Sequence, residues 1–313
     1  MKVLVTSRSF GQITGKAAKI LNDAGFEITY MFKYEKEVFE QAITDYDALI
    51  IGGHPFPAEL LDRCEKLKMI LKHGVGLDNI PVEACGKHGV CVTNAPGANA
   101  EAVADFAVML MMASSRKLMY SANEIKKGNF KANYGTDFHG KTVGLLGFGR
   151  IARYVAKRAA GFGCRVLTYD PYVKELPAEF ADVRICDFTE VLSESDFVSI
   201  HLPLTDETYH MIGKEELSRM KNTAYLVNTA RGGIIDEDEL LNALENGTIA
   251  GAALDVIEHE PVPVDSKLLA NPDILITNHV ASYSKEALDA ISILCANNIV
   301  KYFGGEEPVN RVI

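Results

Sequence analysis

Short apolar runs rich in β-branched residues alternate along this chain with stretches of helical periodicity, and the alternation occurs twice. The first series has strand-like runs at 3–6, 26–32, 48–52, 69–74 and 90–94. The second has them at 142–149, 164–170, 196–202, 223–230, 250–256 and 274–278. Strands that alternate with helices at this spacing form parallel sheets with helices on both faces. The sequence therefore predicts an α/β protein with two Rossmann-like, doubly wound parallel sheets.

The length of 313 residues also favours two domains. The closing amphipathic helix at 285–303 is followed by a tail too short for another domain, and the first series lacks a final crossover of its own. We therefore expect the chain to return to its first domain. Residues 1–98 and 286–313 are predicted to form one discontinuous domain and residues 99–285 the second, with a cleft between them.

The overall charge narrows the class of ligand. Lys and Arg number 32 against 42 Asp and Glu, a net charge of −10, which repels polyanions at long range. We expect neither nucleic acid nor a membrane surface as partner, and a small molecule as ligand. The apolar and charged fractions, 48% and 24%, are those of an ordinary soluble globular protein.

Six cysteines are scattered through the chain without a Cys-x-x-Cys pair, a usage typical of reduced thiols in the cytoplasm. The N-terminal apolar run is broken by Thr6 and Arg8 too early for a signal peptide. Cys85, His88 and Cys91 lie three residues apart, but no further Cys or His pair completes a four-ligand set. We expect a cytoplasmic protein without a metal site.

Residues 100–113 (AEAVADFAVMLMMA) are apolar on nearly every face of a helix. About a dozen apolar residues fall short of the ~20 that cross a bilayer. The segment is therefore predicted to be a helix buried in a core or an interface.

The hexapeptide Gly147-Phe148-Gly149-Arg150-Ile151-Ala152 directly follows a predicted strand and opens a predicted helix, as the dinucleotide fingerprint G-x-G-x-x-G/A requires. Gly147 permits a tight turn, Gly149 lets the backbone approach a pyrophosphate, and Ala152 allows close packing of helix on strand. The pyrophosphate is expected at the helix N-terminus, where free N–H groups and the helix dipole favour an anion.

Asp170 ends the next strand, 23 residues after Gly147, where an acid hydrogen-bonds the adenosine ribose of such a cofactor. A carboxylate there repels a 2′-phosphate, so NAD is expected rather than NADP. The alternative is that the glycines form only a structural turn and Asp170 caps a strand. Strand, motif, helix, strand and acid in register favour cofactor binding.

Three polar residues of the second series follow predicted strands, where ligands bind in open α/β sheets: Arg231, Glu260 and His279. Arg231 presents a planar fork of donors that would bind a carboxylate and polarise a carbonyl. His279 suits proton donation because an imidazole titrates near neutral pH, and Glu260 would orient the ring and stabilise its charged form. Any one of these residues alone would more often be solvated or a cap. Together they suit hydride transfer to a 2-keto acid.

Glycines at alternate positions follow a strand of the first series in KHGVG (72–76). Such a turn presents backbone N–H groups to an anion, and we expect Val75 and Gly76 to hold the substrate carboxylate. An ordinary tight turn is the alternative. His201, at the end of a strand of the second series, is a lesser candidate near the cofactor, and His54 is a lesser candidate facing the cleft.

Seven segments resemble the D-isomer-specific 2-hydroxyacid dehydrogenase family over essentially the whole chain: GVGLDNI (74–80), TNAPGANAEAVAD (93–105), KTVGLLGFGRIA (141–152), HLPLTDET (201–208), LVNTARGGIIDEDEL (226–240), GAALDVIEHEP (251–261) and NHVAS (278–282). By resemblance, Arg231, Glu260 and His279 fill the family's catalytic triad. The resemblance also implies cofactor contacts at Arg150, Ile151, Asp170, Thr229, Ala230, Arg231 and Asp255, the last near the nicotinamide carboxamide. It implies an NAD-binding domain at 99–285, a substrate-binding domain formed by the rest, and a homodimer built on the former.

Within the family the chain looks most like the phosphoglycerate dehydrogenase branch, in a short form without a regulatory domain, which implies D-3-phosphoglycerate and 3-phosphohydroxypyruvate as substrates. That branch usually carries an Arg in the loop after the third strand. Here the loop reads GGHPFP (52–57), where only His54 is basic, and Lys72 could partly compensate. A glyoxylate or hydroxypyruvate reductase, or another D-2-hydroxyacid dehydrogenase, stays open. An NAD(H)-sensing corepressor is a second class, which the acidic charge disfavours.

Overall fold

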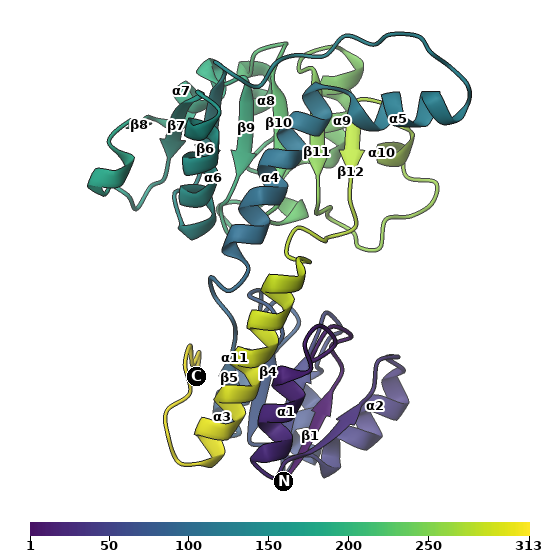
Figure 1. Cartoon of the computed structure of the whole chain (residues 1–313), viewed down its shortest axis with the longest axis vertical. Helices are drawn as coiled ribbons and strands as arrows, with labels where there is room; N and C mark the ends of the chain where they lie inside the picture. Colours follow the sequence, from purple (N-terminus) through teal and green to yellow (C-terminus); the bar gives the residue numbers. More distant parts are fainter. The chain divides into compact units, whose positions relative to one another are not determined.

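Two sheets organise residues 1–313, all of which the computed structural model describes (Figure 1). Every pairing between named strands is parallel, so the predicted fold class of two parallel-sheet α/β layers is confirmed. The chain divides into unit 1, Met1–Asn99 with Tyr283–Ile313, and unit 2, Ala100–Ser282. Each unit has its own buried apolar clusters on the two faces of its sheet.

The sheet of unit 1 has five strands in the order β2-β1-β3-β4-β5. Its strands are β1 (Lys2–Val5), β2 (Glu27–Tyr30), β3 (Ala48–Ile51), β4 (Met69–Lys72) and β5 (Cys91–Thr93). Its helices are α1 (Lys16–Asp23), α2 (Lys36–Ala42), α3 (Val82–Lys87) and α11 (Lys285–Phe303), with 3-10 turns η1 (Ile43–Asp45) and η2 (Ala58–Arg63). The turn η2 has the tighter 3-10 form because amides in it and just after it bond three residues back, as the Cys64 amide does to the Leu61 carbonyl.

The C-terminal helix α11 packs on α1 within unit 1 (Figure 1). Ile291, Cys295 and Ile299, spaced four residues apart, are buried in the same cluster as strand side chains, which is the stripe a helix presents to a core. The Ser292 hydroxyl lies 2.9 Å from Nε2 of His73, in the loop after β4. The end of the chain is thus part of the first unit.

The sheet of unit 2 has seven strands in the order β12-β11-β10-β9-β6-β7-β8. Its strands are β6 (Thr142–Leu146), β7 (Arg165–Tyr169), β8 (Val183–Ile185), β9 (Phe197–Ile200), β10 (Tyr225–Asn228), β11 (Gly251–Leu254) and β12 (Ile274–Ile276). Its helices are α4 (Ala100–Ser115), α5 (Leu118–Lys126), α6 (Arg150–Gly161), α7 (Phe188–Glu194), α8 (Lys214–Arg219), α9 (Glu237–Glu245) and α10 (Lys267–Ala270), with 3-10 turns η3 (Ala178–Phe180) and η4 (Gly232–Ile234).

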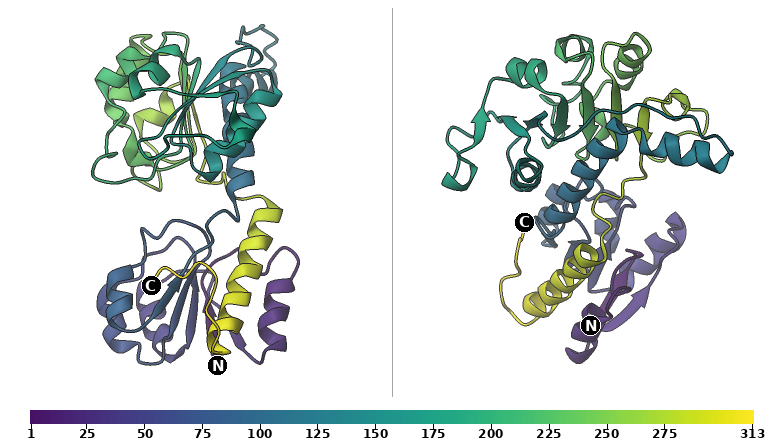
Figure 2. Two further views of the ribbon diagram at one scale, coloured as in Figure 1. Left: turned by 90° about the vertical axis from the view of Figure 1, so that its left-hand side faces the viewer. Right: turned by 45° about the horizontal axis from the view of Figure 1, so that its top comes forward.

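The strand order of unit 2 reverses direction between β6 and β9. From β6 the chain proceeds to β7 and β8 on one side, then returns to β9 and continues to β12 on the other, so that helices cover both faces of the sheet (Figure 2). In open α/β sheets a ligand binds outside the carboxyl ends of the strands at such a reversal. The carboxyl edge of β6, β9 and their neighbours is therefore the place to look for a site.

Helix α4 is a core helix of unit 2. It packs against α6, β10 and β11, and Val103, Ala107 and Leu110 are among its buried residues. Met109 is 46% exposed. The buried helix predicted at 100–113 is present over Ala100–Ser115. None of the chain's helices combines the length and apolar character required to span a membrane.

Candidate functional site

The glycine turn after β6 requires its first glycine. Gly147 has a positive φ of 95°, and a Cβ there would lie 2.9 Å from the His201 carbonyl oxygen. Its amide donates to the Tyr169 carbonyl at 2.7 Å, so the turn is held between the ends of β7 and β9. A Cβ at Gly149 would meet nothing within 4 Å, so that backbone borders open space. Helix α6 begins at Arg150, followed by Ile151, and its first amides have no partners within the helix.

The Asp170 carboxylate lies directly beside this turn. One oxygen accepts from the Phe148 amide at 2.8 Å and the other from the Tyr172 amide at 2.9 Å. Asp170 therefore caps local backbone, as the alternative interpretation expected, and it also places a partly exposed negative charge at the end of β7. Each carboxylate oxygen retains acceptor capacity, so the cap and a ribose contact are compatible.

Two buried polar atoms at the same carboxyl edge have no hydrogen-bond partner: Nε2 of His201, after β9, and Oγ1 of Thr229, after β10. Burial lowers the pKa of His201 to about 4, so its ring is neutral near pH 7. Buried polar groups are normally satisfied. A polar ligand along this edge would satisfy both atoms, so they fit the dinucleotide that the glycine turn implies.

His279 and Glu260 form a direct pair. Nδ1 of His279 lies 2.8 Å from Oε2 of Glu260, and their side chains are 51% and 40% exposed within unit 2. Oε1 of Glu260 accepts from the Ile257 amide at 3.4 Å. A carboxylate that accepts from Nδ1 of a histidine fixes the tautomer of the ring, so that Nε2 is the nitrogen that can exchange a proton.

The loop that carries His279 is built around Asp255, which is 1% exposed. Its carboxylate accepts from the Thr277 hydroxyl at 2.6 Å, from the Val280 amide at 2.9 Å and from the Ala281 amide at 2.8 Å. Its carbonyl accepts from the His279 amide at 2.9 Å, where His279 has a φ of +56°. The family resemblance implied a contact of Asp255 with the nicotinamide, and sequence reasoning missed its part in shaping this loop.

The turn carrying Arg231 depends on Asn228, which sequence reasoning did not single out. Asn228 is fully buried at the end of β10. Its side chain accepts from the Ala230 amide at 2.9 Å and donates to the Arg231 carbonyl at 2.8 Å. The signal that could have revealed it is a polar residue ending an otherwise apolar strand. Because β10, β11 and β12 are neighbours in the sheet, the residues that follow them, Arg231, Glu260 and His279, share one edge.

In unit 1, the Gly74-Val75-Gly76 turn is held from β5. The Asn94 side chain donates to the Val75 carbonyl at 2.8 Å, and the Ala95 amide donates to the Gly74 carbonyl at 2.8 Å. The amides of Val75 and Gly76 donate to no other group of the chain. Such amides can bind an anion. The neighbouring His73 is buried, and burial lowers its pKa to about 4.

The residues that suggested a metal triplet serve other purposes. Cys85 and Cys91 are buried, as are the other four cysteines, and all six are free thiols. The His88 ring hydrogen-bonds the Ala84 carbonyl at 2.8 Å and Asp62 at 2.9 Å. No three His, Cys, Asp or Glu side chains of residues 1–313 are grouped as metal ligands.

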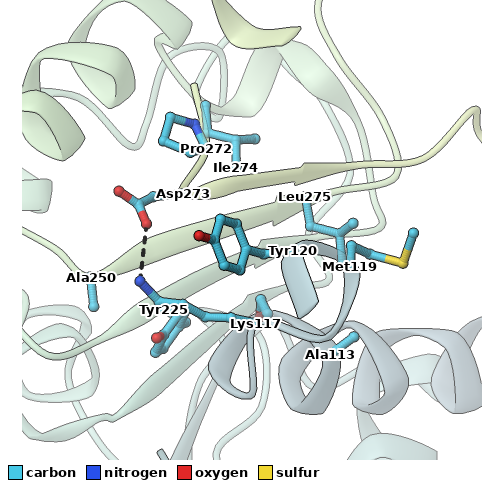
Figure 3. A pocket seen from close by; sticks show the side chains of 11 residues that line it. Ala113, Lys117, Met119, Tyr120, Tyr225, Ala250, Pro272, Asp273, Ile274 and Leu275 are labelled. Carbon is cyan, nitrogen blue, oxygen red and sulfur yellow. Dashed lines mark hydrogen bonds and ion pairs between the residues drawn. The ribbon is translucent and has the colours of Figure 1, made fainter. Parts of the chain in front are cut away.

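A small pocket of about 60 Å³ lies elsewhere in unit 2 (Figure 3). It is lined by Tyr225, Ala250 and Ile274, at the amino ends of β10, β11 and β12, and an ion pair at 3.5 Å joins Lys117 to Asp273 beside it. Ligands of this architecture bind at the carboxyl edge. The pocket is therefore at the wrong end of the sheet for the residues described above.

Comparisons with known proteins agree on one family. A family model described as "D-isomer specific 2-hydroxyacid dehydrogenase, NAD binding domain" matches residues 108–281. The glyoxylate reductase of Korarchaeum cryptofilum is 42% identical over 88% of this chain and 86% of its own length. The D-3-phosphoglycerate dehydrogenase of Methanocaldococcus jannaschii is 39% identical over the whole chain, which spans 59% of that enzyme. The structure of the TT0316 protein from Thermus thermophilus matches with a TM-score of 0.92 at 35% identity, covering 100% of both chains.

Proposed function

This chain belongs to the D-isomer-specific 2-hydroxyacid dehydrogenase family, and from that premise we propose which of its residues carry the reaction and which acid it acts on. The relatives named above are a reductase and a dehydrogenase, and membership makes the chain an NAD-dependent oxidoreductase. NAD, when bound, supplies or accepts the hydride exchanged with C2 of the acid. The observation that carries the catalytic assignment is the 2.8 Å contact between His279 and Glu260.

In the direction of reduction, Nε2 of His279 donates a proton to the carbonyl oxygen of the keto acid. Glu260 accepts the Nδ1 proton of the ring, which keeps Nε2 turned outward and stabilises the imidazolium before it donates. Arg231 pairs with the substrate carboxylate and polarises the carbonyl. In unit 1, the amides of Val75 and Gly76 donate to no other group of the chain, which supports the expectation that they bind a carboxylate.

We assign the cofactor to the carboxyl edge of unit 2. The pyrophosphate lies at the start of α6, and Asp170 binds the adenosine ribose. The unsatisfied atoms of His201 and Thr229 support contacts there. The residues proposed to hold NAD are Gly147, Gly149, Arg150, Ile151, Asp170, His201, Thr229, Ala230, Arg231 and His279. For Asp255, whose carboxylate accepts three hydrogen bonds from the loop carrying His279, we propose the anchoring of that loop in place of the nicotinamide contact that the resemblance implied.

Asp170→Asn tests the choice between NAD and NADP. Asn keeps an acceptor for the Phe148 amide and removes the charge that repels a 2′-phosphate, so we expect the ratio of kcat/KM for NADPH over NADH to rise about tenfold or more. Steady-state rates with both cofactors give the ratio. Asp182→Asn, at an exposed position of the same unit, is the matched control. An unchanged ratio in Asp170→Asn would show that this carboxylate does not select the cofactor.

For the substrate, we propose an unphosphorylated keto acid of the size of glyoxylate or hydroxypyruvate, because the loop after β3 offers no charged ligand for a phosphate. Nε2 of His54 lies 2.7 Å from the Thr6 hydroxyl, and Nδ1 lies 3.0 Å from the Pro55 carbonyl. The ring stacks on Tyr34 at 4.3 Å. Burial lowers the pKa of His54, and the nearby charge of Lys72 lowers it further. The imidazole is therefore neutral near pH 7.

Lys72 was the other candidate for a phosphate ligand in this region. Its ammonium donates to the Gly52 carbonyl at 2.9 Å and to Oδ1 of Asn79 at 2.6 Å. Binding a phosphate would require Lys72 to give up contacts that tie together the loops after β3 and β4. We therefore propose that Lys72 holds these two loops together and does not select for a phosphorylated substrate.

One observation favours the second candidate, 3-phosphohydroxypyruvate. Arg8 is exposed in the loop after β1, at the carboxyl edge of the unit 1 sheet, and its Nε donates to the Phe32 carbonyl at 3.1 Å. This loop lies close to the Gly74-Val75-Gly76 turn, because the Ser9 hydroxyl is 3.4 Å from Nδ1 of His73, the residue before that turn. A guanidinium at this position can form a bidentate pair with a phosphate.

A panel of keto acids separates the two candidates. We expect glyoxylate and hydroxypyruvate to be reduced with higher kcat/KM than 3-phosphohydroxypyruvate, and Arg8→Gln to leave all rates within about twofold, since an exposed arginine without a bound anion contributes little. NADH oxidation measures the rates, and Lys16→Gln, at another exposed cation of unit 1, is the control. A preference for the phosphorylated acid that Arg8→Gln removes would establish the second candidate.

We also propose that two copies associate through the NAD-binding domain. Large apolar side chains are exposed along one stretch of unit 2, including Leu118 at 55%, Met119 at 50%, Phe130 at 86% and Tyr134 at 90%. Contiguous exposed apolar side chains mark interaction surfaces. We expect a dimer by sedimentation equilibrium that Phe130→Ser with Tyr134→Ser weakens, whereas Tyr172→Ser, equally exposed at 91%, does not. A monomeric wild type would refute the proposal.

A further inference from the structure

Hydrogen bonds join three loops at the carboxyl edge of unit 2, those that follow β9, β10 and β11, in addition to the pairing of the strands themselves. After β9, the His210 amide donates to the Gly233 carbonyl at 2.8 Å, and the Ile212 amide donates to the Ile234 carbonyl at 3.0 Å. In return, the Asp236 amide donates to the Ile212 carbonyl at 3.0 Å. The segment after β9 thus pairs with the segment that directly follows Arg231.

Glu258, in the loop after β11, joins this pair through its side chain. Its Oε1 accepts from the Tyr209 hydroxyl at 2.9 Å, and its Oε2 lies 3.1 Å from Nε2 of His210. The two rings stack at 4.0 Å with an angle of 14° between their planes. The Glu258 amide donates to Oε1 of Glu237, in the first turn of α9, at 2.7 Å. The backbone and the side chain of Glu258 are therefore both held by residues from other elements, the loop after β9 and the first turn of α9.

The backbone around Glu258 also packs against the turn that carries Arg231. A Cβ at Gly232 would lie 1.9 Å from the Ile257 carbonyl carbon and 2.3 Å from the Glu258 nitrogen. No side chain fits between these two segments. Glu258 precedes Glu260 by two residues and Gly232 follows Arg231 directly, so a displacement at Glu258 reaches both catalytic side chains.

The groups around Glu258 determine which carboxyl of this network is ionised. Burial opposes ionisation of Glu258, but the hydrogen bonds from His210 and Tyr209 outweigh it and lower the pKa of the carboxyl. Oδ2 of Asp236 lies 3.7 Å from Nδ1 of His210. Burial raises the pKa of the neighbouring Glu237. Glu258 is thus the carboxylate that both rings face, and it is ionised near pH 7.

We propose that Glu258 is a positioning residue for hydride transfer: with Tyr209 and His210 it fixes the loop that carries Glu260 against the turn that carries Arg231. The inference rests on the proposed roles of Arg231, Glu260 and His279. Misplacement of a catalytic group by about 1 Å can cost about 100-fold in rate. The three residues Glu258, Tyr209 and His210, called the clamp below, can therefore affect the rate strongly without touching the substrate.

The test compares Glu258→Gln and Glu258→Ala with Glu207→Gln. Glu207 is an exposed carboxylate in the loop after β9 whose partner is the Thr205 hydroxyl, so it is a matched control outside the clamp. We expect kcat per folded molecule to fall about 10-fold in Glu258→Gln and about 100-fold in Glu258→Ala, with NADH affinity within twofold. The pH profile of kcat is expected to change, because the Glu260–His279 pair loosens.

If Glu258 only stabilises the fold, its variants will have a lower melting temperature but the wild-type kcat per folded molecule and pH profile. That result would overturn the inference. Tyr209→Phe removes one hydroxyl and serves if the Glu258 variants do not fold. We expect it to lower kcat about 3-fold to 10-fold and to have little further effect in a Glu258→Ala background, because coupled residues are not additive. Wild-type kcat in Tyr209→Phe, or full additivity, would also contradict the clamp.

The activity of His279→Gln, measured in the same experiment, distinguishes failure of the Glu258 inference from failure of the proposed catalytic assignment. If His279→Gln is inactive while the clamp variants keep wild-type kcat, the positioning inference fails and the proposed catalytic residues stand. If His279→Gln keeps its activity, the proposed catalytic assignment itself fails.

Discussion

We expect His279→Gln to lower kcat/KM for the keto acid by about 10³-fold and to leave NADH binding largely intact, because His279 is one of many residues proposed to hold NAD. Gln fills similar space and can still hydrogen-bond Glu260, but it carries no proton that it can donate to the carbonyl oxygen. Loss of a positioned general acid costs about 10² to 10⁴ in rate. Since the ring is half exposed in unit 2, its replacement leaves the core intact and stability close to wild type.

Glu260→Gln is the partner experiment. It keeps the shape of the side chain and removes the charge that faces Nδ1, so kcat falls by a smaller factor, about 10², and the pH profile changes because the charged ring loses its stabilising partner. Steady-state NADH oxidation gives kcat and KM, and fluorescence titration gives NADH affinity. His139→Gln, which replaces an imidazole bonded only to the Phe162 carbonyl, is the control. Full activity in His279→Gln would refute the assignment of the acid.

The parts of the fold that could be predicted from the sequence are those whose pattern is dictated by burial. Strands β6, β9 and β10 are buried along their whole length, so they are continuous apolar runs. Strand β8 (Val183–Ile185) is at the edge of the sheet and largely exposed, so it has no such run and was not predicted. Helices α8 and α10 have six and four residues, too few for a helical period to stand out.

The same division applies to the site. The position of Asp170, Arg231 and His279 at one edge of the sheet could be predicted, because each follows a predicted strand and parallel strands bring such positions to one edge. Asn228 bonds the turn that directly follows its own strand, whereas Glu258 bonds residues of the loop after a different strand, β9. Glu258 is 48 residues from His210, and no local pattern tells which of several acids in the segment 236–260 meets that ring. Partners of this kind become visible only when the loops are placed in space.

Asp255 is the residue for which the sequence interpretation and the structure lead to different experiments. A contact with the nicotinamide predicts that Asp255→Asn weakens NADH binding. The structure shows a buried carboxylate that accepts three hydrogen bonds from the loop carrying His279. Asn has one acceptor oxygen, and its amide would face a donor of the loop without water to separate them. Leaving a buried donor unsatisfied costs about 1 to 3 kcal/mol.

We therefore expect Asp255→Asn to destabilise unit 2 by about 2 to 4 kcal/mol, since bonds to a charged acceptor are the stronger ones. We also expect kcat to fall by about 10²-fold, because the His279 loop loses its anchor. Calorimetry reports the stability, which tryptophan fluorescence cannot do because the chain has no Trp.

Asp196→Asn is the matched control, because Asp196 accepts from the Thr142 amide at 2.9 Å and from Lys221 at 3.0 Å at the amino ends of the strands. That variant should lose stability and keep kcat per folded molecule, since it lies at the opposite edge from His279. An Asp255→Asn enzyme that behaves like Asp196→Asn would show that catalysis does not depend on the anchored loop. One that keeps its stability and kcat but binds NADH more weakly would instead establish Asp255 as a ligand of the nicotinamide.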